Sequence, residues 1–135
     1  MFLLDTNIIS ELRRTRPHGA VVAWIEKVAA AEIFISAAAV GEIQVGIERV
    51  RDNDSAKAIE IEHWLVRVVL TMNIIAADAE TFRIWAKFMH GKPPLISGDA
   101  MMAATAVQHD LTVATRNTRD FTQFSVRLLN PFDQA

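Results

Sequence analysis

The sequence predicts an α/β fold, with a five-stranded parallel sheet flanked by helices on both faces. Short apolar runs alternate along the chain with longer amphipathic segments, an alternation typical of parallel strands joined by helical crossovers. The short runs are apolar throughout, as expected of strands that are buried on both faces. Of the 135 residues, 51% are hydrophobic and 22% are charged. This composition allows a sizeable core and excludes a disordered or collagen-like chain.

Five apolar runs are expected to form the strands. They are residues 2–4, 33–35, 72–76, 111–114 and 126–129. No repeat, low-complexity tract or linker interrupts the pattern, so residues 1–135 are expected to form a single domain.

Helices are expected in the segments between these runs, where apolar residues recur at helical spacing. They are residues 8–13, 18–31 and 99–109, and the segments after Ser36, after the turn at 52–55 and after Asp78. Ser36, the turn at 52–55 and Asp78 supply residues that favour helix N-termini. Gly91 is expected to end the helix that begins after Asp78, and Pro93-Pro94 to form a loop.

Composition also restricts the classes of function. The absence of cysteine excludes disulfides, thiolate zinc sites and cysteine nucleophiles, and fits a cytoplasmic protein. The longest stretches without charge are about ten residues, well short of the roughly 20 needed to cross a membrane. Met1–Leu4 is apolar but has no basic leader, so no secretory signal is expected.

The charge pattern leaves nucleic-acid binding open. The net charge is −2, whereas readers of duplex DNA are usually strongly basic. Arginines make up ten of the fourteen cationic residues and cluster at 13/14/16, 49/51 and 116/119. Arginine clamps phosphate well, but charge alone favours ordinary solvated cations.

Polar residues follow three of the expected strands directly. They are Asp5-Thr6-Asn7, Ser36 and Thr115-Arg116-Asn117. In open parallel sheets, ligands bind beyond the carboxyl ends of the strands, at a point where the strand order reverses. The sequence therefore predicts a functional site at this edge of the sheet.

Three acids stand in apolar surroundings: Asp5, Glu42 and Asp99. Taken singly, Asp99 can be read as a helix N-cap and Glu42 as a lone surface acid. If the three converge, their repulsion must be relieved by a retained proton or a bound cation. Carboxylate ligands suit Mg²⁺ or Mn²⁺, the usual apparatus of phosphodiester chemistry.

Other catalytic signatures are missing from the sequence. It contains no nucleophile elbow, phosphate-binding glycine loop, dinucleotide fingerprint or H-E-x-x-H motif. The histidines at positions 18, 63, 90 and 109 have no metal-ligand spacing.

Four blocks of the sequence resemble the PIN-domain ribonucleases, in order and along almost the whole chain. They are Leu3-Leu4-Asp5-Thr6-Asn7, residues 36–47 around Glu42, residues 99–106 from Asp99, and residues 112–121. The closing Asn130-Pro131-Phe132 is also similar to chain ends in this group. The chain looks most like the VapC and FitB type of toxin from prokaryotic toxin–antitoxin pairs.

The resemblance implies a five-stranded parallel sheet and a homodimer that is neutralised by a small antitoxin protein. It also implies an endoribonuclease that depends on Mg²⁺ or Mn²⁺. By the family pattern, Asp5, Glu42 and Asp99 are the catalytic metal ligands. Thr6 and Asn7 shape the first loop by the same pattern, and Thr115 supports the fourth.

One position departs from the pattern, because Asn117 stands where some relatives carry a fourth aspartate. Asp120 is the nearest acid and can also complete the site. We expect Asn117 to be the closer group because it follows the strand end, and Asp120 to cap the turn before Phe121. The expected reaction is in-line attack of an activated water on a phosphodiester of single-stranded or looped RNA.

Four arginines are expected to contact the RNA phosphates: Arg13, Arg14, Arg49 and Arg116.

Three alternative functions stay open. The first is a catalytically weak PIN-like module that binds RNA or protein. The second is a Mg²⁺ phosphatase, which the missing Asp-x-Asp after the first strand disfavours. The third is a receiver-like domain, which the missing lysine in the motif blocks disfavours.

Overall fold

A parallel sheet with strand order β3-β2-β1-β4-β5 forms the centre of the computed structural model, which describes residues 1–92 and 97–133. The strands are β1 (Phe2–Leu4), β2 (Ile33–Ser36), β3 (Asn73–Ile75), β4 (Thr112–Ala114) and β5 (Leu128–Leu129). The bounds of the first four strands lie within one residue of the predicted runs, and β5 covers the second half of the run predicted at 126–129. The predicted five-stranded parallel sheet is therefore confirmed.

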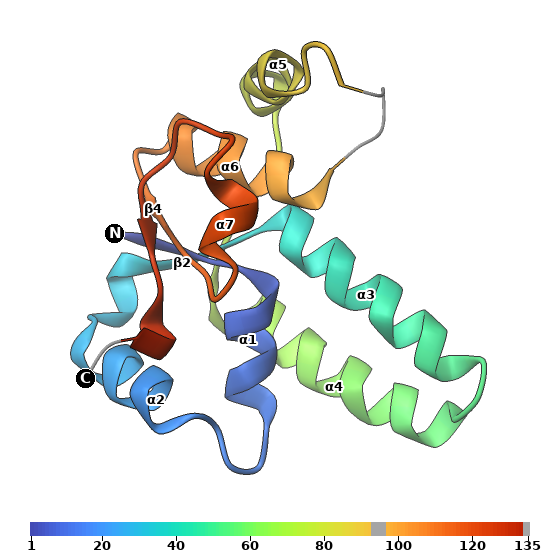
Figure 1. The fold of residues 1–135 in the computed structure, drawn as a ribbon. Helices are drawn as coiled ribbons and strands as arrows, with labels where there is room; N and C mark the ends of the chain where they lie inside the picture. Colours follow the sequence, from blue (N-terminus) through green and yellow to red (C-terminus); the bar gives the residue numbers. More distant parts are fainter. Residues whose placement is uncertain (93–96, 134–135) are drawn as a thin grey trace.

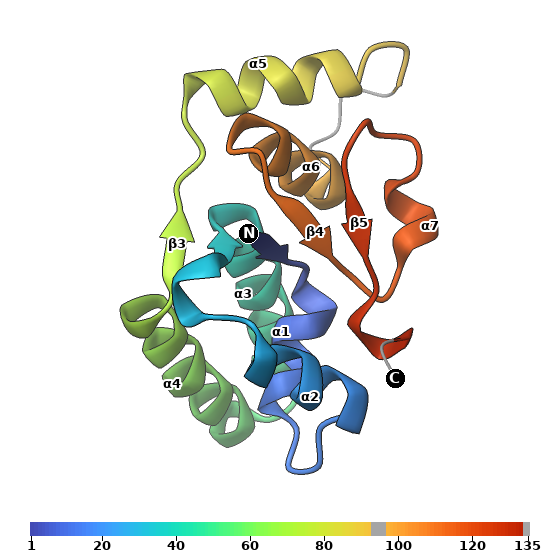
Figure 2. The same ribbon diagram turned by 90° about the vertical axis from the view of Figure 1, so that its left-hand side faces the viewer.

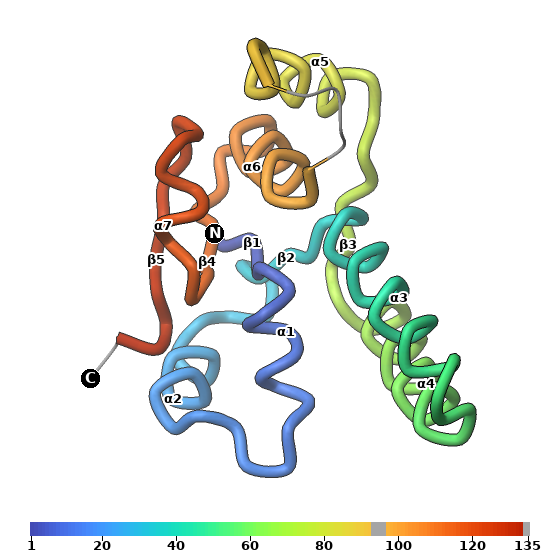
Figure 3. The backbone as a smooth tube through the Cα atoms, turned by 45° about the vertical axis from the view of Figure 1, so that its right-hand side comes forward, coloured from blue at the N-terminus to red at the C-terminus, as the bar shows by residue number. Residues whose placement is uncertain are grey.

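Helices fill the connections between the strands (Figure 1). They are α1 (Thr6–Arg13), α2 (Gly19–Lys27), α3 (Ala37–Arg51), α4 (Ser55–Thr71), α5 (Ala79–Phe88), α6 (Gly98–Gln108) and α7 (Thr118–Phe121). Two 3-10 helices, η1 (Ala30–Glu32) and η2 (Pro131–Asp133), precede β2 and follow β5. Figures 2 and 3 show α5 and α6 together at one end of the molecule, with α1, α2 and α4 toward the other.

The route of the chain places a strand-order reversal at β1. The chain runs outward from β1 through β2 to β3, then crosses back to the other side of β1 and forms β4 and β5. Since such crossovers are almost always right-handed, the helices of the outward half and of the returning half cover opposite faces. The carboxyl ends of β1 and β4 therefore meet at the point where ligands bind in open parallel sheets.

The core lies between the sheet and these helices. Leu3, Leu4, Val113 and Ala114 of the central strands are completely buried. Residues 100–106 of α6 are also buried along the whole run, so this helix is covered on all sides. The apolar surroundings of Asp99 in the sequence thus reflect a helix that runs through the core.

Most of the predicted helix starts are confirmed. Ser36, Asp54 and Asp78 are N-caps, and each side chain accepts a hydrogen bond from the backbone N–H three residues later. Helix α1 begins earlier than predicted because Asp5 caps it. The helix predicted to end at Gly91 ends at Phe88, and Gly91 takes a positive φ of 79° in the turn that follows.

The helix predicted over residues 18–31 is shorter than expected. Helix α2 stops at Lys27, because Val28 and Ala29 are extended and redirect the chain toward β2 through η1. The predicted loop at Pro93-Pro94 lies outside the described residues.

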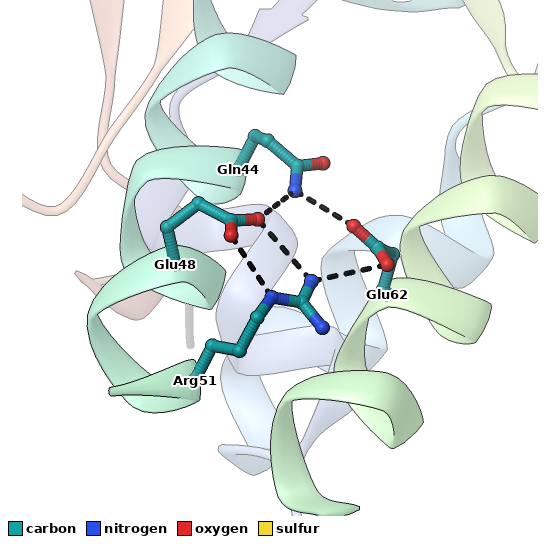
Figure 4. A network of polar contacts seen from close by, with 4 residues as sticks. All are labelled: Gln44, Glu48, Arg51 and Glu62. Atoms are coloured by element: carbon teal, nitrogen blue, oxygen red, sulfur yellow. Dashed lines mark hydrogen bonds and ion pairs between the residues drawn. The ribbon is translucent and has the colours of Figure 1, made fainter. Parts of the chain in front are cut away.

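Helices α3 and α4 pack against each other as a hairpin, visible in Figures 1 and 3. A polar network joins them on the exposed side (Figure 4). The Gln44 amide donates to Glu48 and Glu62 at 2.7 and 2.8 Å, and the Arg51 guanidinium lies 2.9 and 3.1 Å from the same two carboxylates. This network stabilises the position of α3, the helix that carries Glu42.

Within the described ranges, no helix has the length and apolar character needed to cross a membrane.

Candidate active site

Asp5 lies at the carboxyl end of β1 and is only 5% exposed. Its Oδ1 accepts a hydrogen bond from the backbone N–H of Thr6 at 2.7 Å. Its Oδ2 accepts from the Thr115 hydroxyl at 2.7 Å and from the Asn7 side-chain amide at 3.1 Å. Burial raises the pKa of Asp5, while these hydrogen bonds oppose the rise. The carboxylate is thus held in one orientation at the reversal point of the sheet.

The register of β1 against β4 brings Thr115 to Asp5. Leu4 pairs with Ala114, so the residues that follow the two strands are neighbours. Thr115 is completely buried, and its hydroxyl also accepts a hydrogen bond from the backbone N–H of Asn117 at 3.0 Å. The Asn7 side-chain oxygen accepts from the backbone N–H of Arg116 at 3.2 Å, which ties the start of α1 to the loop after β4.

Glu42 projects from α3 and joins this group through Thr6. Its Oε2 accepts a hydrogen bond from the Thr6 hydroxyl at 2.7 Å. Its Oε1 occupies the space that a β-carbon on Gly98 would fill, so the carboxylate lies against the start of α6. Glu42 is therefore not a lone surface acid, because it touches both α1 and α6.

Asp99 lies in the first turn of α6 and is half-buried. The N-cap of this helix is Ser97, whose hydroxyl accepts from the backbone N–H of Ala100 at 3.3 Å. The reading of Asp99 as the N-cap is therefore wrong.

The pKa of Asp99 responds to burial and to the charges of three other acids. Burial raises the pKa of Asp99 to about 6, and the charges of Asp5, Glu42 and Asp120 add to the rise. The charge of Asp120 also raises the pKa of Asp5. The acids that we call the acidic cluster, Asp5, Glu42, Asp99 and Asp120, come from four different elements and act on one site.

Asn117 and Asp120 occupy different places around α7. Asn117 is the exposed N-cap residue of this helix, and its side chain makes no capping hydrogen bond. Asp120 is the third residue of the helix and is also exposed, so it does not cap the turn as predicted. Phe121 is completely buried, as expected of the anchor of this loop.

The donors of the acidic cluster fit a divalent cation. All are carboxylates, the ligands that Mg²⁺ and Mn²⁺ prefer. None of the ion pairs in the described part of the chain includes a member of the cluster. As the side chains are turned here, no group of three or more acidic or histidine side chains among the described residues is arranged to hold a metal. Mutual repulsion keeps such carboxylates apart, so a cation would have to draw them together.

The predicted phosphate contacts divide into two groups. Arg13 lines a hollow of about 310 Å³ together with Thr6 and Glu42, and Arg116 lies over the Phe132 ring at 4.4 Å. The backbone of Arg116 contacts Asn7, so both arginines border the acidic cluster. Arg14 instead pairs with Glu11 at 3.4 Å, and Arg49 lies in a separate hollow along α3.

Sequence reasoning missed two features of this site. Gly98 leaves the space that the Glu42 carboxylate fills, and no local pattern links two residues so far apart in the chain. Ser10 and Trp64 line the same hollow as Thr6 and Arg13. Ser10 lies one helical turn beyond Thr6 on α1, so the helical period alone could have placed it on the same face as Thr6.

The chain is similar in sequence and in structure to known proteins. Residues 2–126 match the family described as PIN domain. The chain is 34% identical to Toxin FitB of Neisseria gonorrhoeae, over 98% of its length and 99% of that protein. It is 33% identical to VapC ribonuclease Y4jK of Sinorhizobium fredii, over the full length of both. The crystal structure of FitAcB from Neisseria gonorrhoeae has a TM-score of 0.82 and 34% identity, covering 98% of this chain and 99% of that one. The structure of FitAB bound to an IR36 DNA fragment has a TM-score of 0.81. The chain with its acid-lined reversal point belongs to the PIN domain family.

Proposed function

We propose that this protein is the toxin of a type II toxin–antitoxin pair and acts as an endoribonuclease that depends on Mg²⁺ or Mn²⁺. The observation that carries the proposal is the placement of carboxylates at the carboxyl end of the sheet: Asp5 accepts from Thr115, and Glu42 accepts from Thr6 and lies against the start of α6, the helix that carries Asp99. The raised pKa of Asp99, caused by burial and by the neighbouring charges, supports it. Perturbed acids that face one another in a cleft are typical of catalytic sites. The relative named VapC ribonuclease Y4jK supplies the substrate class.

Asp5, Glu42 and Asp99 would hold the cation, with Asp120 or Asn117 completing the set. When bound, Mg²⁺ or Mn²⁺ lowers the pKa of water and neutralises charge that develops on a phosphodiester. The all-carboxylate composition of the cluster supports this choice of metal.

The surrounding residues orient the carboxylates of Asp5 and Glu42. Thr115 and the Thr6 backbone donate to the two oxygens of Asp5, which opposes the effect of burial on its pKa. The Thr6 hydroxyl holds one oxygen of Glu42. Since these donors come from α1 and from the loop after β4, the register of the central strands sets the geometry of the site.

RNA in single strands or loops is the proposed substrate, because a flexible backbone can enter the hollow beside the acidic cluster. Arg13 and Arg116 are the better placed of the predicted phosphate contacts. The proposed compartment is the cytoplasm, where such RNA is found.

A small antitoxin protein is the proposed partner, and the chain is proposed to form a homodimer. The support for the antitoxin is the likeness to FitB in its FitAcB and FitAB structures, over nearly the whole chain. Support for self-association comes from the apolar side chains that α4 exposes.

The test is cleavage of a pooled RNA substrate with Mg²⁺, with Mn²⁺ and with EDTA. We expect cleavage that EDTA abolishes and that Asp99→Asn removes. Metal binding should also raise the free energy of unfolding, by about 2.7 kcal/mol at a hundredfold excess over the dissociation constant. Binding of RNA without cleavage under every condition would favour the alternative, a catalytically weak RNA-binding module. No melting shift with millimolar metal would contradict the metal site.

A further inference from the structure

A second hollow lies beside the end of α1 and is lined almost entirely by cations. Its volume is about 430 Å³, and its lining residues are Arg13, Arg14, Thr15, Arg16 and Lys57. The first four come from the end of α1 and the loop after it, and Lys57 comes from the first turn of α4. Figure 2 shows these segments at the same end of the molecule. We call this feature the cationic hollow.

The positive charge of the cationic hollow is only partly compensated. Arg14 pairs with Glu11 at 3.4 Å, and Lys57 pairs with Glu60 at 3.5 Å. None of the ion pairs in residues 1–92 and 97–133 includes Arg13 or Arg16. Because the whole chain carries a net charge of −2, this concentration of cations is local and not a general property of the surface.

Arg13 connects the cationic hollow to the acidic cluster. The same side chain lines the neighbouring hollow that contains Thr6 and Glu42. Its guanidinium lies 5.9 Å from the centre of the Trp64 ring, which holds it between the two hollows. Helix α1 separates the two ends of this path by about 10 Å along its axis. A polyanion longer than a dinucleotide can therefore touch both.

We propose that the cationic hollow binds backbone phosphates of the RNA, one or more nucleotides away from the bond that the acidic cluster cleaves. This inference rests on the proposed function. Guanidinium groups form two parallel hydrogen bonds with phosphate, and the Thr15 hydroxyl adds a neutral donor. The hollow has few apolar neighbours apart from the Trp64 side of Arg13, so it favours the backbone over the bases.

An acidic protein segment is the rival occupant of the cationic hollow. Because Arg13 lines both hollows, a single RNA strand can contact the two of them at once, which favours RNA as the ligand. The experiment below separates the two ligands.

The test compares two triple variants with the same net charge. Arg14→Gln/Arg16→Gln/Lys57→Gln removes cations of the hollow, and Arg83→Gln/Lys87→Gln/Arg127→Gln removes exposed cations elsewhere. Binding of a fluorescein-labelled oligouridylate of about 12 nucleotides is followed by anisotropy in EDTA, over a salt series. Each lost phosphate contact lowers the slope of log affinity against log salt by about 0.7. We expect the hollow variant to bind at least tenfold more weakly with a slope reduced by about 2, and the control to match the parent.

Cleavage assays separate the failure of this inference from the failure of the proposed function. On the long substrate, the hollow variant should lose kcat/KM mainly through a higher KM, while a dinucleotide substrate should show no difference from the parent. A hollow variant that binds and cleaves the long RNA like the parent overturns the inference and leaves the nuclease intact. If the protein cleaves no RNA but the variants show the expected salt slopes, the phosphate-binding role of the cationic hollow stands and the proposed nuclease function is wrong. Loss of binding to a polyglutamate peptide with unchanged RNA binding overturns the inference in favour of a protein ligand.

Discussion

Asp99 is the residue whose ionisation has the largest expected effect on stability. Its pKa rises from 3.8 to about 6 on folding, so between these values the folded state holds more protons than the unfolded state. In metal-free buffer, the free energy of unfolding should therefore fall as the pH rises through this range. Asp5 acts in the same direction, since its pKa is also raised.

The variant Asp99→Asn should lack the part of this decrease in the free energy of unfolding that the ionisation of Asp99 causes. At pH 7 in EDTA we expect it to be more stable than the parent by about 1 kcal/mol, a figure reduced because the group is partly exposed to solvent. Near pH 3.5 the two proteins should unfold alike, since both side chains are then neutral. Urea unfolding at a series of pH values measures this. A stability difference that does not change with pH would contradict the electrostatic account.

Gly98 is expected to position Glu42. In Gly98→Ala the new methyl group takes the space of the Glu42 carboxylate oxygen, the far end of a flexible side chain. The chain should fold with about parental stability, because Gly98 is the first residue of α6 and the group that must move is the end of a flexible side chain. Mn²⁺ affinity and RNA cleavage should both fall by at least tenfold.

The matched control is Gly41→Ala, where an added β-carbon meets nothing within 4 Å. It should retain parental Mn²⁺ affinity. In a Glu42→Gln background, Gly98→Ala should cause no further loss, because the two changes act through the same carboxylate. Additive losses would show that Gly98 acts on something other than Glu42.

Asp120 and Asn117 can be distinguished by single substitutions. The sequence favours Asn117 as the group nearest the strand end, but the charge of Asp120 acts on both Asp5 and Asp99. We therefore expect Asp120→Asn to weaken Mn²⁺ binding and slow cleavage, and Asn117→Ala to do so much less. Calorimetric Mn²⁺ titration and cleavage rates provide the measurement. If Asn117→Ala loses more Mn²⁺ affinity and activity than Asp120→Asn, the fourth ligand is the Asn117 amide.

At the scale of the element, α7 depends on a single aromatic anchor. This helix has four residues, too few to be stable alone, and Phe121 holds it to the core beside Phe124 at a ring-centre distance of 6.4 Å. Phe121→Ala should lower the free energy of unfolding by about 3–5 kcal/mol. It should also loosen the placement of Asp120.

Urea unfolding of Phe121→Ala is compared with that of Phe82→Ala. Phe82 is 44% exposed on α5, so its loss should cost much less. Equal losses in the two variants would mean that α7 is not anchored as described.

At the scale of the whole molecule, the exposed apolar side chains of α4 predict a homodimer. Ile59, Val66 and Leu70 are 47%, 50% and 78% exposed and share one face of the helix. Light scattering at micromolar concentration should give twice the 15.0 kDa of one chain. Leu70→Glu should shift the mass toward the monomer, since it would bury a charge at the interface. A monomeric parent would contradict the prediction.

Local sequence patterns are sufficient to predict the fold class, the five strands and most helix starts. These depend on local patterns, such as continuous apolar runs and N-cap residues like Ser36, Asp54 and Asp78. The resemblance to the PIN domain also pointed to Asp5, Glu42 and Asp99, because the motif residues stand in order along the chain.

The positions of these acids relative to one another depend on tertiary contacts, which no local pattern contains. The contact of Glu42 with Thr6 and Gly98, the influence of Asp120 on Asp99, and the passage from the acidic cluster to the cationic hollow all join segments far apart in sequence. The end of α2 at Lys27 likewise depends on the path that the chain must take into β2. Periodicity reports which face of an element is buried, but distances between charges follow from strand order and helix packing, which bring residues of different elements to the same edge of the sheet.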